Sequence, residues 1–217
     1  TDFITPGGHR PMQEGMEVRM LWNESGLLLH FKAHESTLLT EAQRQYELLA
    51  KPDAVNEDVF RQDSILVILR QPASDKAYEI TVNAAGAVAT AVANPEQLWT
   101  TRDFTWSPEI FVTVAQEDGY WTAKLMIPWA AIGMKAPEPS ERLDVLIGRN
   151  AATRRETGLW GRAEQGVHAP SEWGVIVFTQ QSNLAAGAVE LPQVLGPGKN
   201  QLRLNLQALG RESSEVY

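Results

Sequence analysis

The stretch from Glu117 to Gly133 reads EDGYWTAKLMIPWAAIG, and it decides more of the fold than any other part of the chain. Asp118-Gly119 predicts a hairpin turn, because glycine reaches the positive φ that a tight turn requires. Tyr120 to Ile127 predicts one strand, and Pro128 ends the ladder because proline has no N–H to donate. Residues 129–133 then predict one short helical turn closed by glycine.

Alternating apolar and polar residues recur on both sides of this stretch, as in strands that bury one face. Ile110–Ala115 precedes the Asp-Gly turn and is expected to pair with the strand that follows it. Ser64–Leu69 is almost continuously apolar, which is typical of a central strand covered on both faces. Further strands are predicted at Glu17–Trp22, Leu27–His34, Ala77–Asn83, Ala87–Val92, Leu143–Arg149, Trp173–Phe178 and Gln201–Leu206.

Helix is scarce in this pattern, and Thr40 to Leu49 is the best candidate, with Pro52 beyond its end. About ten short strands and one short helix predict an all-β fold, a two-sheet antiparallel β-sandwich. We expect residues 1–217 to form a single domain. Within it we expect a loop at 179–200, a last strand at 201–209 and a polar tail at 211–217.

Composition excludes several classes of function. The 217 residues carry a net charge of −8, which argues against binding to nucleic acid or to an anionic membrane. There is no cysteine, so disulfides, thiolate metal sites and cysteine nucleophiles are excluded. No apolar run reaches the length of about 18 residues that a transmembrane helix needs, so we expect no membrane insertion. The chain opens on Thr1 rather than Met, which indicates a processed or excised segment.

Four segments, in order, resemble carbohydrate-binding module family 9. Val18 to His34 is similar to the family's V-x-x-L-W-x-x-x-x-L hairpin, and Phe60–Leu69 (FRQDSILVIL) is similar to its W-x-Q-D-S-V-E-I-F-I. Gly119–Trp129 (GYWTAKLMIPW) is similar to G-Y-x-V-E-A-A-I-x-W. Arg149 through Trp160 to Gly174 is similar to R…W…H-x-P-x-x-F-G. The resemblance covers residues 18–178, the family-like core.

The resemblance implies a sandwich that binds sugars without cleaving them. Family members bind the ends of polysaccharide chains between two tryptophans and carry structural calcium. Phe60 stands where one of these tryptophans would lie, and Val167 stands where the second is expected. Leu66 replaces a sugar-binding Glu of the pattern, and Thr81 replaces a sugar-binding Arg. The resemblance therefore carries the fold, while the family's usual sugar site is altered at these positions.

Aromatic side chains are the first candidates for sugar contact, because sugar C–H faces stack on rings while polar neighbours bind the hydroxyls. Trp99, Trp106 and Trp160 lie in polar, loop-like segments, where they either stack on a ligand or cap the ends of the core. Trp22, Trp121 and Trp129 are expected in the core. The predicted ligand-binding residues are Phe60, Gln62, Asn83, Trp99, Trp106, Arg149, Trp160 and His168.

Acidic residues gather just before the central strand. The resemblance assigns Glu57, Asp58 and Asp63 to a structural calcium site, since Ca²⁺ takes several oxygen ligands. The spacing fits no EF-hand loop, so a solvated acidic loop is the alternative. Two roles are also open for Arg149 and His168: they either contact a ligand or belong to a hydrogen-bonded network that holds the last strands in place.

No catalytic motif is present: the sequence holds no G-x-S-x-G, H-E-x-x-H or P-loop. We therefore expect no enzyme but a carbohydrate-binding module of an extracellular or periplasmic bacterial protein, with catalytic domains attached in a longer parent chain. One alternative is a structural or protein-interaction sandwich without sugar binding. A second is a haem-b-binding electron-transfer domain of the DOMON type, with Met and His side chains as ligands.

Overall fold

The computed structural model describes residues 3, 5, 11–36, 50–98, 100–160, 167, 169–178, 184–186 and 206–208. The chain divides into two compact units, Thr1–Val177 and Phe178–Tyr217. In the second unit, β11 (Leu184–Ala186) pairs antiparallel with β12 (Leu206–Ala208). The segment 179–200, predicted as a loop, therefore contains a short strand. The predicted helix Thr40–Leu49 and the tail 211–217 lie outside the described residues.

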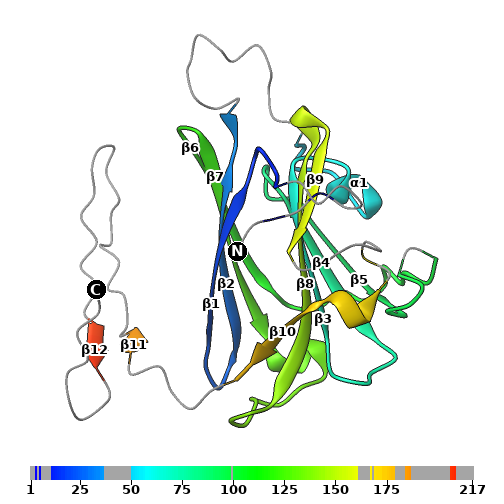
Figure 1. Cartoon of the computed structure of the whole chain (residues 1–217), viewed down its shortest axis with the longest axis vertical. Coiled ribbons are helices and arrows are strands. Elements are labelled where there is room, and N and C mark those ends of the chain that lie inside the picture. Colours follow the sequence, from blue (N-terminus) through cyan, green and yellow to red (C-terminus); the bar gives the residue numbers. More distant parts are fainter. Residues whose placement is uncertain are drawn as a thin grey trace. The chain divides into compact units, whose positions relative to one another are not determined.

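Two antiparallel sheets make up the first unit (Figure 1). The four-stranded sheet has the order β1-β2-β7-β6, with β1 Met16–Trp22, β2 Gly26–His34, β6 Phe111–Glu117 and β7 Tyr120–Pro128. The six-stranded sheet has the order β10-β8-β3-β4-β5, with β3 Ser64–Arg70, β4 Ala77–Asn83, β5 Val88–Ala93, β8 Arg142–Ala151 and β10 Gly174–Val177, while β9 (Glu156–Trp160) also pairs with β8. The predicted β-sandwich is confirmed.

Short helices join the strands of this unit. They are α1 (Glu57–Phe60) and the 3₁₀ turns η3 (Trp129–Ile132), η4 (Ala152–Arg154) and η6 (Pro170–Glu172). No helix in the described part of the chain is long and apolar enough to cross a membrane.

The stretch from Glu117 to Gly133 folds as predicted. Gly119 has a φ of 78°, and β6 and β7 pair from Glu117 opposite Tyr120 onward. β7 ends at Pro128, and the helical turn η3 ends at Gly133, which has a φ of 68°. The strand and the turn that follows it thus depend on two glycines that reach the left-handed region and on one proline that ends the pairing.

The core lies between the two sheets. On β2 and β7, every second residue from Leu27 to Ala33 and from Trp121 to Ile127 is buried. In β3 the six residues Ser64 to Leu69 are all buried, which confirms the prediction of a strand covered on both faces. Arg149 pairs with Ile65 and reaches the ring of Trp121 in the opposite sheet, so this side of β3 faces the core. Leu66 and Ile68 therefore point to the outer side of the six-stranded sheet.

Candidate functional site

The outer face of the six-stranded sheet is closed at the positions where the family pattern has its sugar-binding Glu and Arg. Leu66 and Thr81 are directly opposite each other on β3 and β4, and they are 0% and 1% exposed. Val167, at the position of the second tryptophan, is buried over the same surface. The apolar cluster on this face consists of Leu66, Ile68, Ala77, Ala93, Leu98, Leu146, Leu159, Val167 and Trp173.

An ion pair lies at the margin of the same face. Arg102 donates to both carboxylate oxygens of Glu79, with Nε–Oε2 at 2.9 Å and Nη2–Oε1 at 2.7 Å. Both side chains are almost fully buried. Burial raises the pKa of Glu79, and the charge of Arg102 opposes that rise. The pair satisfies a carboxylate that the covering segments have removed from water.

Three predicted ligand-binding residues meet near the start of β3, where the fold itself uses their polar groups. Asn83 is fully buried and makes all four hydrogen bonds of its amide. Its Nδ2 donates to the Lys51 carbonyl and to Gln62 Oε1, both at 2.8 Å, and its Oδ1 accepts from the N–H groups of residues 85 and 87. Phe60 is half-buried and packs against the apolar cluster. Asn83 therefore supports the β4–β5 turn and leaves no group for a ligand.

Arg149 lies between the two sheets and is fully buried. Its Nη2 donates to the Glu35 carboxylate at 3.3 Å and to the His34 carbonyl at 3.2 Å, and its guanidinium lies 5.3 Å from the ring centre of Trp121. Burial lowers the pKa of Arg149, and the Glu35 charge opposes this shift. Arg149 thus connects the sheets from within, and a ligand in solution does not reach it.

The acids predicted to hold calcium do not meet. Glu57 and Asp58 are exposed on α1, whereas Asp63 is fully buried and accepts a hydrogen bond from Thr153 Oγ1 at 2.7 Å. Within the described ranges, no three His, Asp or Glu side chains are grouped closely enough to hold a metal ion. This arrangement does not fit a calcium ion on Glu57, Asp58 and Asp63, and the calcium site stays a prediction.

The aromatic candidates occupy separate places. Trp106 is half-buried, and its ring centre lies 5.2 Å from that of Tyr78. Trp160 is also half-buried and is the last residue of β9, which pairs with β8 near the opposite edge of the six-stranded sheet from β5. Trp99 and His168 lie outside the described residues. The core assignments are confirmed for Trp121 and Trp129, which are buried, while Trp22 is half-buried.

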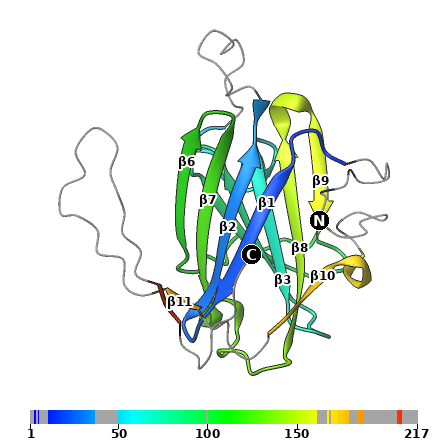
Figure 2. The ribbon, with the colours of Figure 1, turned by 60° about the vertical axis from the view of Figure 1, so that its left-hand side comes forward.

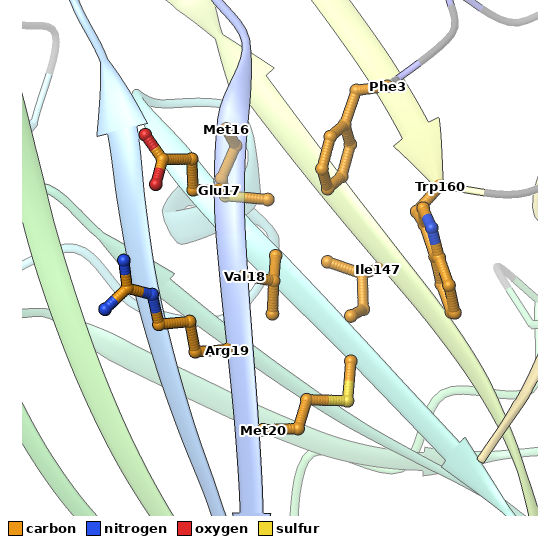
Figure 3. Close-up of a pocket in the computed structure, with 8 residues that line it drawn as sticks. All are labelled: Phe3, Met16, Glu17, Val18, Arg19, Met20, Ile147 and Trp160. Carbon is orange, nitrogen blue, oxygen red and sulfur yellow. The ribbon is translucent and has the colours of Figure 1, made fainter. Parts of the chain in front are cut away.

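An open groove lies between the edge strands β1 and β9 (Figure 3). Its volume is about 340 Å³, and it is lined by Phe3, Met16, Glu17, Val18, Arg19, Met20, Ile147 and Trp160. The rings of Phe3 and Trp160 face the groove from the β9 side, and the side chains of Glu17 and Arg19 point to the other side of β1 (Figure 3). Phe3 is buried and Trp160 is half-buried, so the indole of Trp160 is the main aromatic surface of the groove.

The position of Trp160 depends on a glycine in the neighbouring strand. A Cβ at Gly174 would lie 2.9 Å from Cε3 of Trp160 and closer still to Cζ3. The indole thus packs directly over the backbone of β10, an approach that only glycine allows. This contact holds the indole against β10, and Trp160 also lines the groove.

Sequence reasoning found Trp160 but missed the other residues of this groove. Phe3 precedes the first strand, and its backbone carbonyl accepts from the Met12 N–H at 2.9 Å. Both residues lie beside Gly158 of β9. The sequence did show that Met16, Val18 and Met20 alternate with polar residues on β1. That alternation predicts a buried strand face and does not predict a groove.

Two of the Met and His side chains considered for haem, Met20 and His30, lie on opposite faces of their sheet. Met20 lines the groove and pairs with Leu29 on β2. His30 is the residue after Leu29, and because side chains alternate along a strand it points to the opposite face of the sheet. This geometry offers no Met–His pair across one cavity at these two positions.

Comparison with known proteins relates the chain to solved structures. No protein-family model matches the sequence. No curated protein matches it either. A protein of Bacteroides uniformis, itself only proposed to bind carbohydrate, is 14% identical with a TM-score of 0.63, over 82% of this chain and 84% of the other.

Two further structures are of a family 9 carbohydrate-binding module from Caldicellulosiruptor kristjanssonii. The complex with glucose is 13% identical with a TM-score of 0.57, over 84% of this chain and 86% of that one. The complex with cellotriose is 14% identical with the same TM-score, over 84% of each chain. The resemblance predicted from the sequence is confirmed at the level of the fold: this chain has the β-sandwich fold of the family 9 carbohydrate-binding modules.

Proposed function

We propose that this chain is a non-catalytic saccharide-binding module and that the groove between β1 and β9 holds the sugar. The observation that carries the proposal is the half-buried indole of Trp160 beside one open groove of about 340 Å³, with the buried ring of Phe3 also in its lining. Small-molecule sites start at about 300 Å³ and combine an apolar lining with a few polar groups. The groove has that size, and its exposed lining is a mixture of polar and apolar atoms.

The wall formed by β1 supplies the polar groups. β1 is the outer strand of its sheet, so half of its backbone N–H and C=O groups point away from β2. Those beside the groove suit sugar hydroxyls, while the indole of Trp160 suits the C–H face of the ring. Binding of this kind relies on stacking and neutral hydrogen bonds, so we expect it to change little with salt.

The structural relatives support the ligand class. Glucose and cellotriose are bound in two structures of the same fold. In our chain the corresponding face of the six-stranded sheet is filled at Leu66, Thr81 and Val167, so the proposed site moves to the edge of the sandwich. We further propose that the module acts outside the cytoplasm, as part of a polysaccharide-acting protein with catalytic domains.

A glycan array is the first experiment, followed by calorimetry with glucose and cellotriose. We expect Trp160→Ala to abolish binding, because it removes the stacking surface. Trp106→Ala is the matched control, since it removes a half-buried indole that packs on Tyr78 outside the groove. If the folded protein binds no glycan on the array, this result would contradict the proposal and favour a structural or protein-interaction role.

Calcium is tested in the same titrations. We propose structural calcium on the family resemblance alone, and the positions of Glu57, Asp58 and Asp63 do not add to that support. Each titration is run with added Ca²⁺ and with EDTA, and the unfolding temperature is recorded in both. A higher unfolding temperature with Ca²⁺ would support the ion; equal temperatures would contradict it.

A further inference from the structure

The outer face of the four-stranded sheet carries a row of exposed apolar side chains. Leu21 pairs with Leu28, Leu28 with Met126 and Met126 with Phe111, so these four residues form one row across all the strands. Leu21, Leu28 and Phe111 are 56%, 39% and 61% exposed. Figure 2 shows the four strands side by side in front of the other sheet. A contiguous apolar row on an exposed sheet face indicates a binding surface.

Two cationic side chains with a histidine between them, called the cationic row below, lie two residues further along the same strands. Arg19 pairs with His30, and His30 pairs with Lys124. Arg19 and Lys124 are exposed, and neither makes an ion pair with an acid in the described part of the chain. Partial burial lowers the pKa of His30, and Lys124 and Arg19 lower it further while Glu17 opposes the shift, so Arg19 and Lys124 carry the positive charge of this row at pH 7. Positive charges that lack partners are informative in a chain of net charge −8.

We propose that this face binds an acidic polysaccharide that crosses the strands, with its sugar rings on the apolar row and its carboxylates on the cationic row. The inference extends the proposed function to a second site that shares no ligand-facing side chain with the groove. Glu17 and Arg19 line the groove with their backbone atoms, and the side chain of Arg19 points to the outer face of the sheet (Figure 3).

The spacing of the rows favours a saccharide over an extended peptide. Neighbouring strands are about 4.8 Å apart, so the charges of Arg19 and Lys124, which are two strands apart, lie about 9.6 Å from each other. In an extended uronate chain with a two-fold screw, the carboxylates that face one side belong to every second ring and recur at a similar interval. An extended peptide presents same-side residues about 6.8 Å apart, which misses this interval. The C–H faces of the rings also suit the apolar row.

The test uses polygalacturonate, with methyl-esterified polygalacturonate as the uncharged polymer of the same backbone. We expect calorimetry or affinity electrophoresis to show binding of the acidic polymer, at least about tenfold weaker binding of the ester, and weakening with added salt. Arg19→Gln and Lys124→Gln are each expected to weaken binding by about threefold, and the double variant by about tenfold. Lys76→Gln removes one exposed positive charge from the β3–β4 connection and is the matched control.

Further variants and probes separate the outcomes. Phe111→Ala should weaken polygalacturonate binding without changing its salt dependence, and Trp160→Ala should leave it intact while abolishing binding of neutral sugars. Equal affinity for poly-glutamate would overturn the inference in favour of an acidic protein partner. A folded protein that binds cellotriose but not polygalacturonate would also overturn it and leave the proposed function standing. Polygalacturonate binding without cellotriose binding would support this face and contradict the groove.

Discussion

The outer faces of the two sheets differ, although both sheets are antiparallel and both alternate regularly. Segments that follow the strands cover the six-stranded sheet, bringing Leu98, Val167 and Trp173 over Leu66 and Ile68. Among the residues that the structure describes, no comparable layer lies over Leu21, Leu28 and Phe111 on the four-stranded sheet, and all three are exposed. The family pattern places its sugar contacts on the face that is closed here. A shared fold therefore does not fix which face is available, and function has to be sought on the open surfaces.

The largest expected effect comes from restoring the family's acidic residue on the closed face. Leu66→Glu buries a carboxylate in an apolar cluster, and we expect it to lower the free energy of unfolding by at least about 4 kcal/mol. Leu21→Glu makes the same change at an exposed position of the other sheet, and we expect less than about 1 kcal/mol. Urea unfolding measures both. A stable Leu66→Glu variant that gains glucose binding would show that the closed face opens.

The second effect concerns the ion pair at the margin of the closed face. Arg102→Met leaves the buried carboxylate of Glu79 without its partner, which we expect to cost about 3 kcal/mol at pH 7. The double variant Glu79→Gln/Arg102→Met removes both charges and should recover part of the loss. If the single variant is as stable as the native protein, the covering segment that carries Arg102 is not packed as described.

The pH dependence of that variant sharpens the test. Burial already raises the pKa of Glu79, and loss of Arg102 removes the group that opposes this rise. A raised carboxyl pKa means that the folded state binds the proton more tightly than the unfolded chain, so stability falls as the pH rises through the folded pKa. We therefore expect Arg102→Met to be less destabilising at pH 4 than at pH 7. Unfolding curves at the two pH values check this sign.

Local signals were enough to predict most of the strands. The hairpins β1–β2, β4–β5 and β6–β7 each combine alternating apolar and polar residues with a turn sequence. Both features depend on a few neighbouring residues, so they can be recognised in the sequence. β9 was missed because Gly158 interrupts its pattern. The side of Gly158 where a Cβ would stand is filled by Met12 and Phe3, so tertiary packing, not alternation, makes this segment a strand.

The candidate site was harder to predict, because residue type does not tell a ligand contact from an internal one. Asn83 and Arg149 have side chains that suit sugars, yet Asn83 supports a turn and Arg149 joins the sheets. The groove depends on a contact between β9 and the N-terminal segment, which no local pattern encodes. The cationic row likewise exists only once the register of three strands is known.

A moderate effect is expected where Trp160 packs on the backbone of β10. Gly174→Ala would force the indole out of its position, and we expect a loss of about 1–3 kcal/mol in stability together with weaker binding of neutral sugars. Gly15→Ala is the control, because a Cβ at that glycine meets nothing within 4 Å. Calorimetry with cellotriose and thermal unfolding are the measurements. Unchanged sugar affinity in Gly174→Ala would remove Trp160 from the proposed site.

The smallest expected effect reports on the open face directly. Partial burial lowers the pKa of His30, and the charges of Lys124 and Arg19 lower it further while Glu17 opposes the shift. Lys124→Gln removes one like charge, so the pKa of His30 should rise. NMR titration of the imidazole protons measures it, with Lys76→Gln as the variant that should leave it unchanged. Bound polygalacturonate should raise the same pKa, because a nearby carboxylate favours the protonated ring. A His30 titration that responds to neither change would mean that the cations are too far apart in solution to act as one row.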